Sequence, residues 1–145
     1  MPKDVRPPSS TLSPEQLRQV RIPFIQRAAL AFGSVREDVF LVDLGLSGAF
    51  IERAGALPEG ERVQLGFPLP GNVNRIQALC RVAWWNSPSA ALVTKALPAG
   101  LGLEFLEMSP ADRERLRAHL LEYLSRKSGR RFHRSRPIDD GGDPP

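Results

Sequence analysis

The chain has 145 residues, of which 41% are hydrophobic, and this length and composition fit one domain with a sizeable core. Its one cysteine, Cys80, excludes an intramolecular disulfide and argues against a cysteine zinc site; we expect it to be a small buried hydrophobe. No apolar run reaches the length of a membrane span, and the first residues lack the apolar core of a signal peptide, so we expect a cytoplasmic protein.

The net charge of +4 is concentrated at the C-terminal end of the chain. Residues 126–145 carry six basic and three acidic groups, whereas residues 17–125 carry twelve basic and eleven acidic groups. The basic pI therefore describes an appendage and not a basic globular surface. Residues 126–145 show no apolar periodicity, and we predict a disordered tail that is first basic and then acidic.

The N-terminal residues 1–16 contain too few apolar groups to offset the entropy of ordering, and we predict a disordered arm. Within it, Ser13 and Pro14 have the pattern of an N-cap and a first helical residue, so a short helical turn is expected there. That turn should end before Pro23, because the residue before a proline avoids the helical region.

Three arginines, Arg18, Arg21 and Arg27, follow within ten residues and have no acid among them. They fit either an anion-binding patch or a solvated basic edge, and the sequence leaves both interpretations open.

Six segments have the alternating or continuous apolar pattern of β-strands. Residues 33–38 between the first two are polar and predict a hairpin connection, and residues 86–98 predict a loop. The expected strands are residues 27–32, 39–44, 49–53, 62–69, 75–85 and 99–106. Six strands about ten residues apart, with no helix between them, predict a mainly β protein with an antiparallel barrel or sandwich.

Residues 40–51 predict a strand, a tight turn and a second strand. Phe40, Val42 and Leu44 are expected on one face because strand side chains alternate. Gly45 and Gly48 fit a turn that needs positive φ. Asp43 and the two glycines therefore have a local explanation, as turn cap and turn residues, and a ligand site is the alternative.

A C-terminal helix is expected to open at Ser109, with Pro110 at its first position and Asp112 near the positive end of its dipole. Its apolar stripe should cover the barrel and consists of Leu116, Leu120, Tyr123 and Leu124. We expect the helix to fray near residues 125–129.

Candidate catalytic residues are scarce. The two histidines, His119 and His133, are far apart and have no nucleophile placed beside them by a known motif, so we predict no enzyme and no metal site. Trp84 and Trp85 end a strand; alternation predicts one ring in the core and the other outside, and stacking on a base is the alternative.

The order of these residues resembles the PilZ domain, a bacterial module known as a receptor for cyclic di-GMP. Its signature joins Arg-x-x-x-Arg to [Asp/Asn]-x-Ser-x-x-Gly about twenty residues later. Here Arg21 is followed by Ile-Pro-Phe, Asp43 lies 22 residues further on, and Gly48 lies five beyond that. Later segments of the family are matched by residues 58–60, 81–84 and 100–105. The resemblance covers about residues 17–125 and implies a PilZ-like domain there, a six-stranded antiparallel barrel with a C-terminal helix.

Two signature positions differ. Leu17 stands where the first arginine would fall, although Arg18 is adjacent, and Gly45 stands where the serine would fall. The resemblance implies that the arginines grip phosphates and guanine edges, that Asp43 accepts from guanine N–H groups, and that Gly48 lets the backbone approach the ligand.

The resemblance favours a non-catalytic bacterial signalling protein that acts as a protein-binding adaptor. Its partner would be a regulatory or motility protein, its cyclic di-GMP site would be degenerate, with weak or absent binding, and it would need no cofactor. The alternative is a functional cyclic di-GMP receptor that uses Arg21, Asp43 and Gly48, with Arg18 or Arg27 substituting for the missing arginine. The tail could touch anionic lipid or nucleic acid, or only keep the protein soluble.

Overall fold

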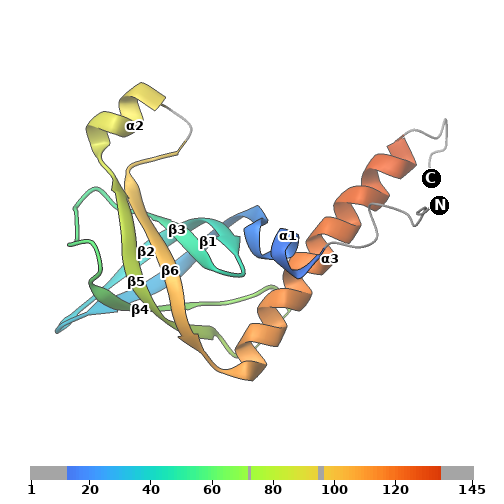
Figure 1. The fold of residues 1–145 in the computed structure, drawn as a ribbon, viewed down its shortest axis with the longest axis horizontal. Helices are drawn as coiled ribbons and strands as arrows, with labels where there is room; N and C mark the ends of the chain where they lie inside the picture. The colour runs from blue at the N-terminus through green and yellow to red at the C-terminus, as the bar shows by residue number, and fades with distance from the viewer. Residues whose placement is uncertain (1–12, 72, 95–96, 135–145) are drawn as a thin grey trace.

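A computed structural model describes residues 13–71, 73–94 and 97–134. In this part of the chain, six antiparallel strands close into a barrel in the order β1-β2-β3-β6-β5-β4, with β4 paired to β1 (Figure 1). The strands are β1 (Arg21–Phe32), β2 (Val35–Gly45), β3 (Gly48–Glu52), β4 (Arg62–Phe67), β5 (Ile76–Asn86) and β6 (Gly100–Met108). The predicted mainly β barrel is confirmed, and its closure leaves no open sheet edge.

The barrel interior follows the alternation of the sequence wherever the strands are regular. On β4, Val63, Leu65 and Phe67 all point inward and are at most 1% exposed. Cys80 on β5 is fully buried, and this burial raises the pKa of its thiol to about 12. The prediction of a small buried hydrophobe at Cys80 is confirmed, and the thiol is protonated at neutral pH.

The first hairpin is longer than the sequence suggested. β1 begins at Arg21 instead of residue 27, and β2 begins at Val35, so the expected connection over residues 33–38 was wrong. Gly33 has a φ of 56°, which allows a tight turn between Phe32 and Val35. Residues 36–38 are polar because this end of the hairpin faces solvent, and polarity alone does not distinguish an exposed strand from a loop.

A bulge in β2 overturns the expected face of that strand. The register to β3 shifts between Leu41 and Asp43, which inserts one extra residue. Leu41 and Leu44 therefore both point inward, whereas Phe40 is 47% exposed and Val42 is only partly buried. The expectation that Phe40, Val42 and Leu44 share one face was wrong.

A second bulge, in β5, explains why the tryptophans do not alternate. The register to β6 shifts between Val82 and Trp84, and both Trp84 and Trp85 are nearly half exposed. The predicted split into one core ring and one outer ring was therefore wrong. The next buried residue is Asn86, whose Nδ2 donates a hydrogen bond to the carbonyl of Pro98 over 2.9 Å.

Two short helices flank the barrel, α1 (Pro14–Gln19) and α2 (Pro88–Thr94). The expected turn at Ser13 is confirmed: Ser13 and Gln16 form a reciprocal capping box, so α1 starts inside the predicted arm, whose residues 1–12 lie outside the described part. α2 replaces part of the expected loop over residues 86–98. It begins where Ser87 Oγ accepts a hydrogen bond from the Ala90 N–H over 3.1 Å.

The C-terminal helix α3 (Pro110–Arg134) begins as predicted, with Ser109 Oγ accepting from the Asp112 N–H over 3.0 Å. Leu116 and Leu120 are fully buried against the core. The helix does not fray near residues 125–129, so that expectation was wrong. A single glycine costs only about 1 kcal/mol in a helix, and the neighbouring arginines and lysine are good helix formers. Of the predicted tail, residues 126–134 are helical and residues 135–145 lie outside the described part.

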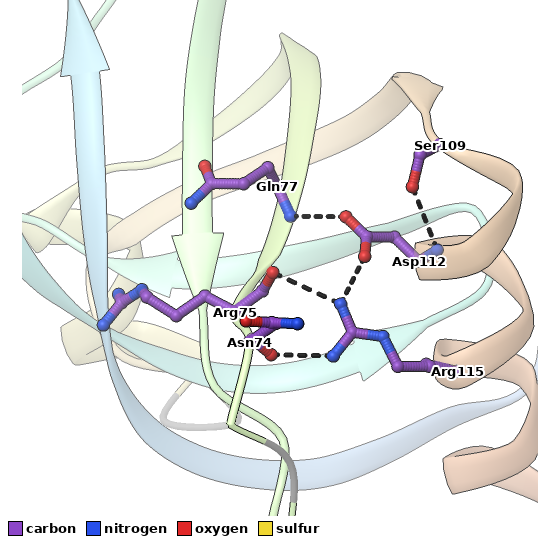
Figure 2. A network of polar contacts seen from close by, with 6 residues as sticks. All are labelled: Asn74, Arg75, Gln77, Ser109, Asp112 and Arg115. Carbon is purple, nitrogen blue, oxygen red and sulfur yellow. Dashed lines mark hydrogen bonds and ion pairs between the residues drawn. The ribbon is translucent and has the colours of Figure 1, made fainter.

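A polar network holds the first turn of α3 on the barrel (Figure 2). Asp112 accepts a hydrogen bond from the Gln77 N–H over 3.0 Å and pairs with Arg115. Arg115 in turn donates to the carbonyls of Asn74 over 2.7 Å and Arg75 over 3.4 Å. We call these five residues the α3 clamp. It fixes the rotation of α3 about its own axis because two side chains one turn apart both bind the barrel.

We expect Asp112→Asn to lower the free energy of unfolding by about 2 kcal/mol at pH 7, because hydrogen bonds to a charged group are worth about 1.5–3 kcal/mol. Burial alone would raise the pKa of the Asp112 carboxyl, but the Gln77 N–H and Arg115 outweigh it and lower that pKa. The native state therefore binds the proton less readily than the unfolded chain. The contribution is present above the unfolded value of about 3.9 and is lost as the pH falls through the lowered native pKa.

Urea unfolding of the unaltered protein and of Asp112→Asn at pH 7 and pH 3 measures the contribution of the Asp112 carboxylate. The two free energies of unfolding should differ less at pH 3 than at pH 7. The matched control is Asp38→Asn, which changes an exposed ion pair with Arg27 at 4.0 Å and should cost less than about 0.5 kcal/mol. Equal losses in the two variants would contradict the clamp.

Candidate functional site

The site begins at the connection between β2 and β3, which consists of Leu46 and Ser47. The carbonyl of Ser47 accepts a hydrogen bond from the Phe105 N–H over 2.8 Å, which ties this connection to β6. The strand–turn–strand predicted over residues 40–51 is confirmed. The connection is therefore a fixed part of the barrel wall.

Gly45 and Gly48 do not adopt positive φ, contrary to the expectation for turn glycines; in the described part of the chain Gly33, Gly60 and Gly71 do. Close approach of the backbone explains them instead. A Cβ at Gly48 would lie 2.1 Å from the carbonyl oxygen of Leu103, and one at Gly45 would lie 2.6 Å from that of Val20. Both glycines are required by the barrel before any ligand is considered.

Arg21 and Asp43 come together although they lie 22 residues apart. The pairing of β1 with β2 aligns Arg21 with Gly45 and Pro23 with Asp43, and a guanidinium nitrogen of Arg21 lies 2.7 Å from Asp43 Oδ1. Asp43 thus binds the side chain of Arg21. Among the described residues it accepts no hydrogen bond from a backbone N–H of the turn, so the expected role of a turn cap was wrong. Both side chains remain partly exposed, at 42% and 24%.

The two positions that differ from the signature are built into the protein interior. Leu17 on α1 is 4% exposed and belongs to the buried core. Gly45 packs directly against the Val20 carbonyl and the side chain of Arg21. An arginine or a serine at these positions would have to displace existing packing.

Arg18 and Arg27 lie in different places. Arg27 is six residues beyond Arg21 on β1, about 20 Å further at about 3.3 Å per residue. It faces Asp38 at 4.0 Å and the Phe40 ring at 5.8 Å. Arg18 instead lines a hollow beside the β2–β3 connection. Of the two, the structure brings only Arg18 near that connection.

This hollow, which we call the arginine hollow, has a volume of about 340 Å³. Its floor and rim come from α1, the β2–β3 connection, β6 and α3, and its lining residues are Arg18, Leu46, Ser47, Phe105, Arg113 and Arg117. Sequence reasoning missed Arg113 and Arg117. The available signal was their spacing of four residues beside the apolar stripe of α3, which predicts that they share a helix face next to the barrel.

His119 lies on the barrel side of α3, with its ring 5.4 Å from that of Phe24 in an edge-to-face arrangement. Burial lowers the pKa of His119, and Arg126 lowers it further, while Glu122 raises it in part. A neutral imidazole packed on an aromatic ring fits a structural role. In the described residues no three side chains of His, Cys, Asp or Glu gather where they could hold a metal ion, and no helix is long and apolar enough to cross a membrane.

The sequence of this chain matches the model of a known domain family. The family model of the PilZ domain matches residues 15–122, a range that spans all six strands of the barrel and the clamp. The chain belongs to the PilZ family. No curated protein sequence matches it significantly.

Solved PilZ structures share the fold. The inhibitor of motility MotI/DgrA of Bacillus subtilis is 19% identical, with a TM-score of 0.58 over 78% of this chain and 52% of that chain. YcgR of Escherichia coli in complex with c-di-GMP is also 19% identical, with a TM-score of 0.58 over 82% of this chain and 50% of that chain. The PilZ domain of YcgR with c-di-GMP is 18% identical, with a TM-score of 0.53 over 79% and 95%.

The chain therefore spans about half the length of the first two proteins. At sequence identities of 18–19%, the similarity to these structures shows a shared fold. The predicted PilZ barrel with a C-terminal helix is confirmed. The binding roles predicted for Arg18, Arg21, Asp43 and Gly48 stay predictions.

Proposed function

We propose that this PilZ protein is a non-catalytic regulatory module that acts by binding another protein, and that its cyclic di-GMP site is weakened. The observation that carries the proposal is the burial of Leu17, which is 4% exposed at the position of the first signature arginine. A buried leucine cannot supply the bidentate hydrogen bonds that an arginine gives to phosphate or guanine.

Two hydrogen bonds to the ligand are lost at this site. A missing charge-assisted hydrogen bond costs about 1.5–3 kcal/mol, and a missing neutral one, at Gly45, about 1 kcal/mol. Together they correspond to at least a roughly hundredfold weaker affinity, at about 1.4 kcal/mol per factor of ten. Arg21 also lies 2.7 Å from Asp43, so a ligand must share or break that ion pair.

The proposed partner is a bacterial regulatory or motility protein. The name of one structural relative, an inhibitor of motility, is consistent with such a partner. A cytoplasmic location and a contact of the basic C-terminal residues with anionic lipid or nucleic acid stay predictions within this proposal.

A second candidate function is a cyclic di-GMP receptor, and one observation favours it. Arg21 and Asp43, two residues that match the family signature, lie 2.7 Å apart beside Gly45 at the end of β2. In this case Arg18, whose side chain lines the neighbouring hollow, is the substituting arginine, because Arg27 lies well along β1.

Isothermal titration with cyclic di-GMP distinguishes the adaptor with a weakened site from the cyclic di-GMP receptor. We expect no saturable binding at micromolar ligand for the unaltered protein, because of the losses described above. The variants are Arg21→Ala and, as a control that removes an equal charge elsewhere, Arg62→Ala on the exposed side of β4. Micromolar or tighter binding that disappears in Arg21→Ala but persists in Arg62→Ala would replace the first proposal with the second.

A genetic test addresses the adaptor itself. If the partner binds the protein surface and no nucleotide is needed, the Arg21→Ala chain should restore the wild-type phenotype to a deletion strain as fully as the unaltered chain does. Loss of function in a stably folded Arg21→Ala protein would contradict this proposal.

A further inference from the structure

Four strands form a second hollow, on the outer face of the barrel. The strand register places Ala29 of β1 between Asp38 of β2 and Gly66 of β4, and Gln77 of β5 follows Gly66 in the same row. These four residues and their neighbours line a cavity of about 700 Å³, which we call the four-strand hollow. Ala29 lies eight residues beyond Arg21 on β1, about 26 Å at about 3.3 Å per residue. The hollow is therefore separate from the family signature.

The floor of the four-strand hollow is made by residues with small side chains. Ala29 and Ala31 of β1 and Gly66 of β4 all line it, and Arg36 on β2 and Gln77 on β5 carry long side chains on either side. A Cβ at Gly66 would lie 3.0 Å from Gln77 Oε1. The amide of Gln77 therefore leans over the floor and is directed into the hollow.

The rim of the four-strand hollow carries an excess of positive charge. Arg36 comes from β2, Arg27 from β1, and Arg75 from the residue before β5. Against these three arginines the lining includes one carboxylate, Asp38, which lies 4.0 Å from Arg27. Residues 17–125 as a whole are nearly balanced, with twelve basic and eleven acidic groups. The local excess of positive charge favours a negatively charged partner.

Two of the polar side chains are positioned by the α3 clamp. The clamp binds the carbonyl of Arg75 and the N–H of Gln77, and the side chains of both residues extend away from α3 (Figure 2). A guanidinium nitrogen of Arg75 donates to the Gly66 carbonyl over 2.8 Å, which holds this group over β4. A guanidinium has five N–H donors, so others remain for a ligand. This preorganisation reduces the entropy lost on binding.

The combination of arginine and glutamine distinguishes between anionic partners. The planar donors of arginine match the two oxygens of a carboxylate. Gln64 and Gln77, which both line the hollow, each add an amide with donors and an acceptor, and such an amide is complementary to a peptide group. A fully ionised phosphate offers acceptors only, so it would leave both amide carbonyls without a donor. The lining therefore suits a peptide that carries carboxylates.

We propose that the four-strand hollow binds an extended acidic segment of the protein partner. Carboxylates of this segment pair with Arg27, Arg36 and Arg75, and its backbone bonds with the amides of Gln64 and Gln77. From β2 to β5 the hollow crosses three strand spacings of about 4.8 Å, or about 14 Å, which matches about four residues of extended chain. This inference rests on the proposed function, because it assigns a surface to the protein partner proposed there.

The first test uses the full chain labelled with ¹⁵N and titrated with an acetylated and amidated hexapeptide of alternating glutamate and alanine. We expect saturable amide shifts at Ala29, Ala31, Gly66 and Gln77. The same peptide with glutamine in place of glutamate, and succinate, which has two carboxylates but no peptide group, should each bind about tenfold or more weakly. Equal binding of succinate, or shifts that centre on α3 or on the β2–β3 connection, would overturn the inference.

Variants then assign the peptide binding to the rim. Arg27→Gln with Arg36→Gln should weaken it about tenfold or more, from the loss of charge-assisted hydrogen bonds. The control, Arg117→Gln with Arg126→Gln, removes the same charge from α3 and should change the affinity less than about twofold. All four arginines are exposed, so folding is expected to persist and is checked by thermal unfolding. An equal loss in the control would show attraction by net charge alone and overturn the site.

Complementation of a deletion strain distinguishes this inference from the proposed function. We expect the Arg27→Gln, Arg36→Gln chain to fail to restore the wild-type phenotype, whereas Arg21→Ala restores it. If both chains restore the phenotype, the adaptor stands and the four-strand hollow is overturned as its binding surface. If the hollow variant restores the phenotype and a stably folded Arg21→Ala does not, both the hollow and the proposed function are overturned.

Discussion

Gly48→Ala is expected to lower the free energy of unfolding by about 3 kcal/mol or more, at or above the upper end of overpacking effects. The added Cβ would lie 2.1 Å from the carbonyl oxygen of Leu103. Both groups belong to paired strands, since Gly48 lies opposite Glu104 in the β3–β6 ladder. No side-chain rotation relieves this contact, so the strands must separate locally. The family signature associates this glycine with ligand binding, but the close packing of β3 against β6 already requires a residue without a Cβ here.

Urea unfolding followed by far-UV circular dichroism measures the effect without any ligand. Gly55→Ala is the matched control, because the nearest atom to its new Cβ is a side-chain nitrogen of Arg53 at 3.1 Å and not a backbone atom of a paired strand. We expect that control to change stability by less than about 0.5 kcal/mol. A Gly48→Ala protein with unaltered stability would mean that the glycine is kept for ligand approach alone.

Leu17→Arg should lower the free energy of unfolding by about 2–4 kcal/mol, although it restores the signature arginine in the sequence. The leucine side chain is 4% exposed, so its loss removes buried apolar contacts and brings a charge into their place. The new side chain can avoid the cost only if α1 leaves the barrel. A signature residue is therefore not regained by one substitution.

The matched control is Leu92→Arg on α2, where the leucine is 75% exposed and the same change should cost less than about 0.5 kcal/mol. Thermal unfolding of both variants compares them, and amide hydrogen exchange over residues 14–19 detects the detachment of α1. A Leu17→Arg protein as stable as the control, with α1 protected, would show that the pocket of Leu17 can accept an arginine.

The barrel could be predicted because most of its strands alternate regularly. The alternation over residues 62–69 predicted a strand, on which Val63, Leu65 and Phe67 are buried, and the helix start at Ser109 followed from capping chemistry. The errors in assigning strand faces occurred where one extra residue enters a strand. The bulges at Val42 and Ala83 each invert the following side chains, and no local propensity marks such an insertion.

Prediction of the site was limited in a different way. The resemblance implied that Arg21 and Asp43 serve one ligand site, which stays a prediction; their direct ion pair was not predicted and follows from the pairing of β1 with β2. Arg113 and Arg117 were not predicted either, since their approach to Ser47 depends on how α3 is rotated against the barrel. Sequence spacing fixes which residues share a helix face, but the docking of that face is a tertiary property.

The α3 clamp has a mechanical consequence. The 25 residues of α3 span about 38 Å at 1.5 Å per residue. The clamp holds one end, and the C-terminal turns extend away from the barrel (Figure 1). The clamp at Asp112 and Arg115 and the burial of Leu116 and Leu120 hold the first half of the helix. These contacts together set the direction in which the basic end of the helix is presented.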